Sequence, residues 1–398
     1  MLKSKWIFVS LLLCVLLPLA ANATITRVIG LGGANANYII KDAANPQIWP
    51  QLIADWPNLA GAEFYNSSSV WDFQKAYLNY SCGESGSVFQ IAIDKLPGIN
   101  SMFFGGSPYT LLPTVTDTTG TGGNTPASKL SVTWGMPLNG MKIGAALNIA
   151  EHSYKNKATP ADEDKATLIG INLGGSFLDN KLDAAVGFES VSGSMKPGAS
   201  GSGEDKTDGS MALNVSARYW WMYADKMALV PNIRFQTQKD AVKFDGGDKD
   251  GYTTTDIKVG IGHNWTPVEN TLAIFELGVD VQNVKDESTT SGVTTTIKTT
   301  VNSMPYWRIG FETKVFDWLN GRLGAERNWV NETNDAKPLE PEAAFSQTST
   351  FVGATAHWNR LIFDLLIEPN FFEQGPNFIS GYNNNLFTRV SLKYDFNK

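Results

Sequence analysis

Hydrophobic and polar residues alternate, one for one, through much of the chain from residue 130 to its end. In the last alternating segment, residues 386–396, Val390 and Leu392 fall on one face while Arg389 and Lys393 fall on the other. Successive residues of a β-strand point to opposite sides, so this pattern predicts a strand with one apolar and one charged face. The same alternation recurs at residues 141–150, 182–189, 213–221, 256–265, 273–280, 307–315 and 361–368.

The connections between these segments alternate between short and long. Tight links fall at residues 137–140, 178–181, 223–226, 266–270, 316–321 and 358–360. Polar, Gly-rich stretches separate them, at residues 153–165, 193–209, 239–251, 286–296, 331–346 and 371–384. An outer-membrane barrel sorts its connections in this way, with short turns on the periplasmic side and long loops outside. A soluble β-sandwich has no reason to do so. The pattern therefore predicts an all-β fold, a transmembrane antiparallel up-and-down β-barrel.

The strand count follows from the same segments. Counting back from residue 396 gives thirteen segments to Leu130, and residues 88–95 add a fourteenth. Two weaker segments, at residues 61–65 and 73–80, would raise the count to sixteen. A barrel whose two ends both lie on the periplasmic side has an even number of strands. We therefore expect about fourteen strands, with sixteen as the alternative.

Aromatic residues lie within a few positions of every predicted short turn. Amphipathic aromatic rings gather where the membrane meets water, and in barrels they form girdles there. The sequence therefore predicts an aromatic girdle at one interface, made of Trp134, Phe177, Trp221, Trp265, Trp318 and Trp358.

The first 23 residues have the features of a signal peptide. Lys3 and Lys5 precede an apolar run, and the small residues at 21–23 offer a cleavage site. Cleavage would leave Cys82 as the single cysteine, which excludes an intrachain disulfide. It would also leave 30 of the 32 basic residues against 39 acidic ones, and a net charge of −9 argues against nucleic acid as a partner. Beyond the signal no apolar run approaches the length of a spanning helix, so membrane residence requires a barrel.

Residues 24–59 differ from the barrel segments that follow them at 60–398. Glycines near residue 30 and the prolines Pro46, Pro50 and Pro57 interrupt any long helix or strand. Between the prolines, Trp49 and Leu52 belong to a short apolar helical face. We predict that this stretch is either a plug folded into the barrel or a periplasmic lead-in to the first strand.

Charged side chains recur on the strand face opposite the apolar one. Such side chains line an aqueous path and bias which solutes pass, or they pair across strands and close the lumen. The residues predicted to line the pore are Arg218, Arg234, Lys258, Glu276, Asp280, Arg308, Glu312, Lys314, Arg322, Glu326, Arg389 and Lys393.

Groups that could carry catalysis or hold a metal are sparse. The only histidines are His152, His263 and His357, and no serine-containing elbow accompanies them, so we predict no catalytic residue and no enzyme activity. The acidic stretch at residues 245–251 lacks the DxDxDG spacing of a calcium loop, so neither a metal nor another cofactor is predicted. Its carboxylates are expected to be solvated, and bridging divalent cations would let such loops meet lipopolysaccharide.

The pattern from residue 61 to residue 396 resembles that of Gram-negative outer-membrane porins and transporters. Ahead of the first strand, the run Gly30-Leu31-Gly32-Gly33-Ala34, the acidic Asp42 and Asn45-Pro46 resemble the long-chain fatty-acid transporter family. That resemblance implies an N-terminal hatch, fourteen strands and hydrophobic solutes. The chain departs from the family at Gln47, where an alanine is usual, and at the single acid Asp42, where two are usual. Phe396 near the end of the chain implies recognition by the barrel-insertion machinery, although two residues follow it.

Together these features predict an exported protein of the cell outer membrane that passes small solutes passively, as a porin or channel does. Two alternatives stay open. One is a plugged transporter that moves hydrophobic substrates by conformational change, and the other is a structural or surface-interaction barrel with a closed lumen. The expected partners are outer-membrane lipid, lipopolysaccharide, the insertion machinery and small solutes, while the oligomeric state is left open.

Overall fold

The computed structural model describes residues 24–67, 70–83, 85–95, 128–155, 163–196, 204–245, 247–335, 343–367 and 386–397, so the predicted signal peptide lies outside the described residues. Four short helices come first: α2 (Ile25–Gly30), η1 (Ala34–Tyr38), η2 (Asn45–Gln47) and η3 (Pro50–Asp55). The strands are β1 (Leu59–Ser67), β2 (Val70–Cys82), β3 (Ser87–Lys95), β4 (Ser128–Leu138), β5 (Met141–Lys155), β6 (Glu163–Phe177), β7 (Leu182–Lys196), β8 (Asp205–Thr207), β9 (Ser210–Tyr219), β10 (Trp221–Ala224), β11 (Met227–Lys243), β12 (Lys249–Trp265), β13 (Thr271–Thr290), β14 (Val293–Phe316), β15 (Leu319–Asn334), β16 (Ala343–Trp358), β17 (Leu361–Ile367) and β18 (Phe387–Asp395).

The strands form one closed antiparallel sheet, because β1 pairs with both β2 and β18. The segments β8, β9 and β10 follow one another along a single crossing beside β11, so the barrel has sixteen crossing strands. The two weakly patterned segments at the start belong to the wall as β1 and β2, which gives the larger of the two predicted counts. The predicted up-and-down β-barrel is confirmed.

The outer face of the barrel is apolar and exposed, while its inner face is polar and buried. In β6, Ile171 and Leu173 are 50% and 51% exposed, whereas Asn172 between them is 1% exposed. Soluble proteins rarely leave a continuous apolar surface of more than a few hundred Å² in water. Lipid solvates such a surface at no cost, so the outer face of the wall is the face that meets the membrane.

Tight turns join the strands at one end of the barrel, here called the short-turn end. At the β4–β5 turn, Asn139 and Gly140 have φ angles of 46° and 80°. Positive φ at both central residues is the requirement of a type I′ hairpin turn, which Asn-Gly meets at little steric cost. The predicted girdle aromatics lie on the outer face near this end, where Trp221, Trp265 and Trp358 are 56%, 41% and 48% exposed. Their role at a membrane interface stays a prediction.

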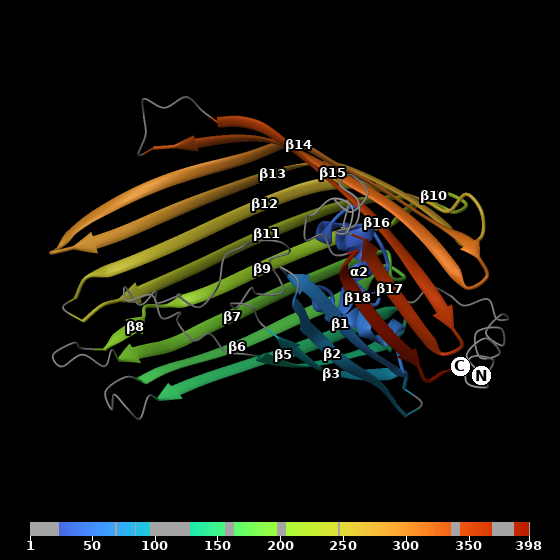
Figure 1. Ribbon diagram of the computed structural model, residues 1–398, viewed down its shortest axis with the longest axis horizontal. Helices are drawn as coiled ribbons and strands as arrows, with labels where there is room; N and C mark the ends of the chain where they lie inside the picture. Colours follow the sequence, from blue (N-terminus) through green and yellow to red (C-terminus); the bar gives the residue numbers. More distant parts are fainter. Residues whose placement is uncertain are drawn as a thin grey trace, which may run out of the picture.

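The opposite end, here called the long-loop end, differs from the sequence prediction in more than one place. The loop predicted at residues 239–251 is shorter, because β11 extends to Lys243 and β12 begins at Lys249. The larger difference lies between β13 and β14. Residues 286–296 were expected to form a polar loop, but they are the tip of the β13–β14 hairpin, with its turn at Ser291 and Gly292 (Figure 1). The two strands have 20 and 24 residues, more than the roughly 9–11 that cross a bilayer. Threonines dominate the tip and favour strand conformation without giving a hydrophobic alternation. The predicted loop at residues 371–384 lies outside the described residues.

Candidate functional site

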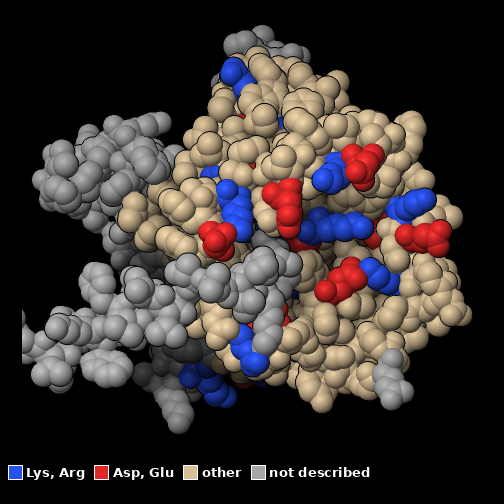
Figure 2. Space-filling view, turned by 90° about the vertical axis from the view of Figure 1, so that its right-hand side faces the viewer, with Lys and Arg blue, Asp and Glu red and all other residues tan. Residues whose placement is uncertain are grey.

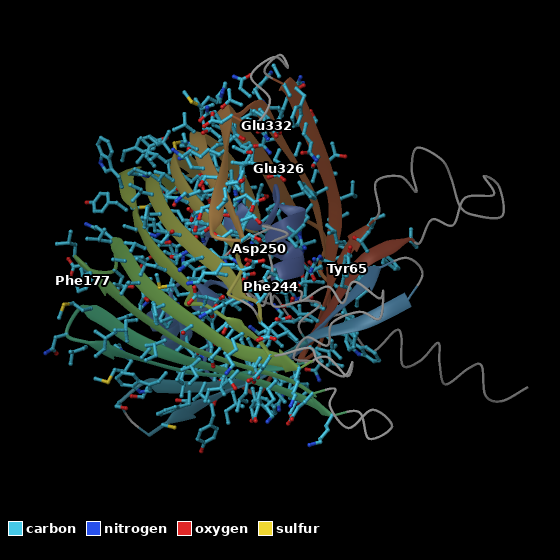
Figure 3. The ribbon with its side chains drawn as sticks, turned by 90° about the vertical axis from the view of Figure 1, so that its left-hand side faces the viewer. Tyr65, Phe177, Phe244, Asp250, Glu326 and Glu332 are labelled. Atoms are coloured by element: carbon cyan, nitrogen blue, oxygen red, sulfur yellow. The ribbon has the colours of Figure 1, made fainter. Side chains whose placement is uncertain are left out.

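Residues 24–58, here called the N-terminal segment, lie inside the barrel (Figures 1 and 3). Val28, Leu31, Ile39 and Trp49 are completely buried and belong to one cluster with wall residues such as Val230. In Figure 3, which looks in from the long-loop end, the blue helix of this segment is enclosed by the ring of strands. The segment thus occupies part of the lumen, and its action as a plug stays a prediction.

Glycines of the wall let the backbone of the N-terminal segment approach closely. A Cβ at Gly144 on β5 would collide with the backbone of Gln51, and one at Gly310 on β14 would collide with the carbonyl of Leu31. Side chains at these two wall positions would therefore push the segment away. Both glycines lie within a few residues of a short turn, which places the segment near the short-turn end.

Six buried charges join the segment to the wall, and they are here called the anchor network: Arg27, Asp42, Glu312, Arg322, Asp364 and Lys393. The Arg27 guanidinium donates to the Asp42 carboxylate at 2.8 Å and to the Glu312 carboxylate at 2.7 Å. Each member has a side chain no more than 8% exposed. Three positive and three negative charges leave the network neutral overall, as burial of charge requires.

The wall half of the anchor network continues across β14, β15, β17 and β18. Arg322 Nε donates to Glu312 at 3.0 Å, and Arg322 Nη2 donates to Asp364 at 3.1 Å. The Lys393 ammonium on β18 lies 3.7 Å from Asp364. Asp364 also contacts the segment, because it accepts a 3.0 Å hydrogen bond from the Thr24 hydroxyl. Burial raises the pKa of Asp42, and the charge of Arg27 opposes that rise.

A second attachment forms on the other side of the lumen around Arg218 of β9. Its guanidinium pairs with Asp183 at 2.8 Å and donates to the carbonyls of Asn37 and Ile40, both at 2.9 Å. It also lies 4.9 Å from the ring centre of Trp49, a cation–π distance. One buried arginine therefore satisfies backbone carbonyls of the segment that no regular helix pairs.

The structure places the predicted pore-lining charges on the inner face and pairs most of them across neighbouring strands. The pairs are Arg218 with Asp183, Arg234 with Asp256, Lys258 with Asp280, Arg308 with Glu276 and Glu326, Arg322 with Glu312, and Lys393 with Asp364. Lys314 pairs with Asp317 at the short-turn end, and Arg389 lies 4.7 Å from the ring centre of Tyr65. Their contact with a passing solute stays a prediction.

The inner wall also carries a band of uncharged polar side chains farther from the short turns. Asn214 on β9 lies opposite Gln236 on β11, and Gln238 follows on the same face. All three are at most 3% exposed. The amide nitrogens of Asn214 and Gln238 lack a hydrogen-bond partner in the described protein. Nearer the short turns, the amide oxygen of Asn172 on β6 also lacks one, while its amide nitrogen donates to the Ile48 carbonyl of the N-terminal segment at 3.1 Å. Buried polar atoms without a protein partner mark places where water or a polar solute binds well.

The histidines and acidic residues form no obvious reactive centre in the described part of the chain. His263 lies on the strand β12, and its Nε2 is 2.6 Å from the Tyr223 hydroxyl at an exposed site. Among the described residues, no group of three or more His, Cys, Asp or Glu side chains is arranged to hold a metal ion.

No described helix combines the length and hydrophobicity that a membrane crossing requires.

The wall half of this site can be predicted from the sequence, whereas the half on the N-terminal segment cannot. Glu312, Arg322 and Lys393 were predicted from strand alternation. Arg27 was not, because a single arginine in an irregular Gly-rich stretch has no periodicity to indicate its direction. Asp42 drew notice only through the family resemblance.

These observations define a class of protein: a transmembrane β-barrel of the outer-membrane type, with its N-terminal segment inside the lumen. No protein-family model and no curated protein matches the chain. Solved structures do show a likeness, with low identity.

Among them, a Pseudomonas aeruginosa FadL homologue is 13% identical with a TM-score of 0.44, covering 95% of this chain and 99% of that one. The Pseudomonas putida toluene transporter TodX is 11% identical with a TM-score of 0.35, covering 95% and 97%. The ferric yersiniabactin uptake receptor FyuA from Yersinia pestis is 10% identical with a TM-score of 0.39 and covers 78% of this chain. The chain spans little more than half of that receptor, 54% of its length.

Proposed function

We propose that this protein is a gated transport barrel of the outer membrane. In this proposal the N-terminal segment closes the lumen at rest and moves aside to let small polar solutes through. The observation that carries the proposal is the anchor network, which fixes the segment to the inner wall through Arg27, Glu312 and neighbouring charges. Short turns face the periplasm in such barrels, so the closure lies on the periplasmic side.

The chemistry of the anchor network supports a segment that can be displaced. Ion pairs in a buried site recover little net energy, because the cost of removing both charges from water offsets their attraction. When the segment leaves, Arg27 and Glu312 both regain water, so separation costs less than exposing an apolar core of the same size. The ion pairs therefore fix the position of the segment and add little to the cost of releasing it, and most of that cost comes from its apolar cluster with the wall.

The occupied lumen favours this gated barrel over a permanently open porin. The backbone of the segment packs directly on the wall at Gly144 and Gly310, which lie on different strands of the barrel. Close packing at both sites leaves less room for a path between segment and wall. Passive passage at rest would need such a path.

The polar inner wall favours polar solutes over the hydrophobic ones that the family resemblance implied. Asn172, Asn214 and Gln238 present buried amide atoms without a protein partner. An apolar solute beside them would leave these atoms unpaired, at a cost of about 1–3 kcal/mol each. A solute rich in hydroxyl or amide groups would pair with them instead.

A liposome-swelling assay tests the proposal. The full protein, a variant lacking residues 24–58 and empty liposomes would be compared in iso-osmotic neutral pentose, with circular dichroism confirming a folded barrel. We expect the deletion variant to admit the pentose several-fold faster than the full protein. Equally fast entry through both would indicate an open porin, and no entry through either would indicate a closed structural barrel.

A further inference from the structure

A cup opens at the short-turn end, between the N-terminal segment and the wall. Its volume is about 650 Å³, within the range of small-molecule sites. The cup is lined by residues that include Ile40, Lys41, Lys181, Trp220, Lys226 and Leu272. Figure 2 faces this end of the molecule and shows basic and acidic side chains interspersed across it.

The charge of the cup is mainly positive. Lys41 comes from the N-terminal segment, Lys181 from the β6–β7 turn and Lys226 from the β10–β11 turn. In the described part of the chain, none of the three forms an ion pair with a carboxylate. The fourth lysine, Lys142, is already held by Asp55 at 2.6 Å, and among the described residues of the lining Asp179 is the one acidic side chain.

The floor of the cup is aromatic and aliphatic. The Lys41 ammonium and the Arg218 guanidinium each lie 5.0 Å from the ring centre of Trp220. The side chains of Ile40 and Leu272 complete the apolar surface. Although Lys41 is exposed at the rim, partial burial of its ammonium and the nearby Arg218 lower its pKa. An added negative charge would relieve the repulsion between these two cations.

We propose that this cup is a binding site for a small organic anion with an apolar body. Three lysines without carboxylate partners attract the negative group, and charge-assisted hydrogen bonds from their ammonium groups hold it. The half-buried Leu272 and the other apolar residues of the lining take the apolar body, which a bare inorganic anion lacks. Because Lys41 lies on the segment and Lys181 lies on the wall, such a ligand bridges the two. This site is distinct from the proposed solute path and does not depend on it.

Isothermal titration of the full protein in nanodiscs tests the site with three probes: 2-naphthoate, its neutral isostere 2-naphthalenemethanol, and inorganic phosphate. We expect naphthoate to bind about tenfold more tightly than either of the other two, and more weakly as ionic strength rises. Equal binding of naphthoate and the alcohol would overturn the role of the lysines. Equal binding of naphthoate and phosphate would overturn the role of the apolar floor.

A matched pair of variants locates the binding. The double variant Lys181→Gln with Lys226→Gln removes two charges from the cup, and the control Lys206→Gln with Lys243→Gln removes two charges at the other end of the barrel. The cup variant is expected to bind naphthoate about tenfold more weakly, with the control unchanged. No naphthoate binding by the full protein, or an equal effect of both double variants, would refute the site. All four positions are on or near exposed turns, so circular dichroism should be unchanged.

Discussion

At the scale of single residues, Glu312 links the N-terminal segment to the wall. It accepts hydrogen bonds from Arg27 of the segment and from Arg322 of β15. Removing one partner of a buried ion pair costs up to about 3–5 kcal/mol. Without Glu312, Arg27 keeps Asp42 and Arg322 keeps Asp364, so the buried network is left with one uncompensated positive charge. Here that cost falls on the docked state alone, since Arg27 meets water once the segment departs.

The variant Glu312→Gln should therefore loosen the segment while leaving the barrel folded. We expect hydrogen exchange of the amides at residues 24–58 to accelerate at least tenfold, with wall amides little changed. Mass spectrometry of exchanged peptides measures this. The matched control is Glu332→Gln, which removes the same charge from the strand β15 outside the anchor network. Equal protection of residues 24–58 in both variants would show that the network does not hold the segment.

At the scale of elements, the strands could be predicted because lipid outside and polar groups inside impose a strict alternation on each of them. The pattern fails where that contrast disappears. The β13–β14 tip extends beyond the membrane and has threonine on both faces, so its sequence predicts a loop where the structure has strands. The strands β1 and β2 show only weak alternation, yet the register of β1 with β18 closes the barrel.

The lipid-facing side of β6 offers a direct test of the element arrangement. Arginine on the lipid face at mid-membrane costs about 2–4 kcal/mol, and the cost falls to near zero outside the membrane. We expect Ile171→Arg to lower the free energy of unfolding in lipid by about that amount. Val293→Arg, at the exposed start of β14, should change it by less than about 1 kcal/mol. Both would be measured by reversible denaturant titration, and similar values would contradict the assigned membrane position.

At the scale of the whole molecule, the β-barrel could be predicted from the sequence, but the way the N-terminal segment packs inside its lumen could not. The alternation of apolar and polar residues, together with the alternation of short and long connections, indicates a closed barrel. The same residue alternation identifies the charged side chains that point inward. The position of the N-terminal segment depends on tertiary contacts. Arg218 donates to the carbonyls of Asn37 and Ile40, and wall glycines leave room for the irregular backbone of the segment. No periodic pattern in the sequence indicates such contacts, because each one joins a residue of the segment to a wall residue that lies far from it in the chain.

Single-channel current across a planar bilayer tests the central claim, that the N-terminal segment closes the lumen. We expect the full protein to stay mostly closed, Glu312→Gln to open in brief steps, and the variant lacking residues 24–58 to conduct steadily. Steady current through the full protein, indistinguishable from that of the deletion variant, would contradict that claim.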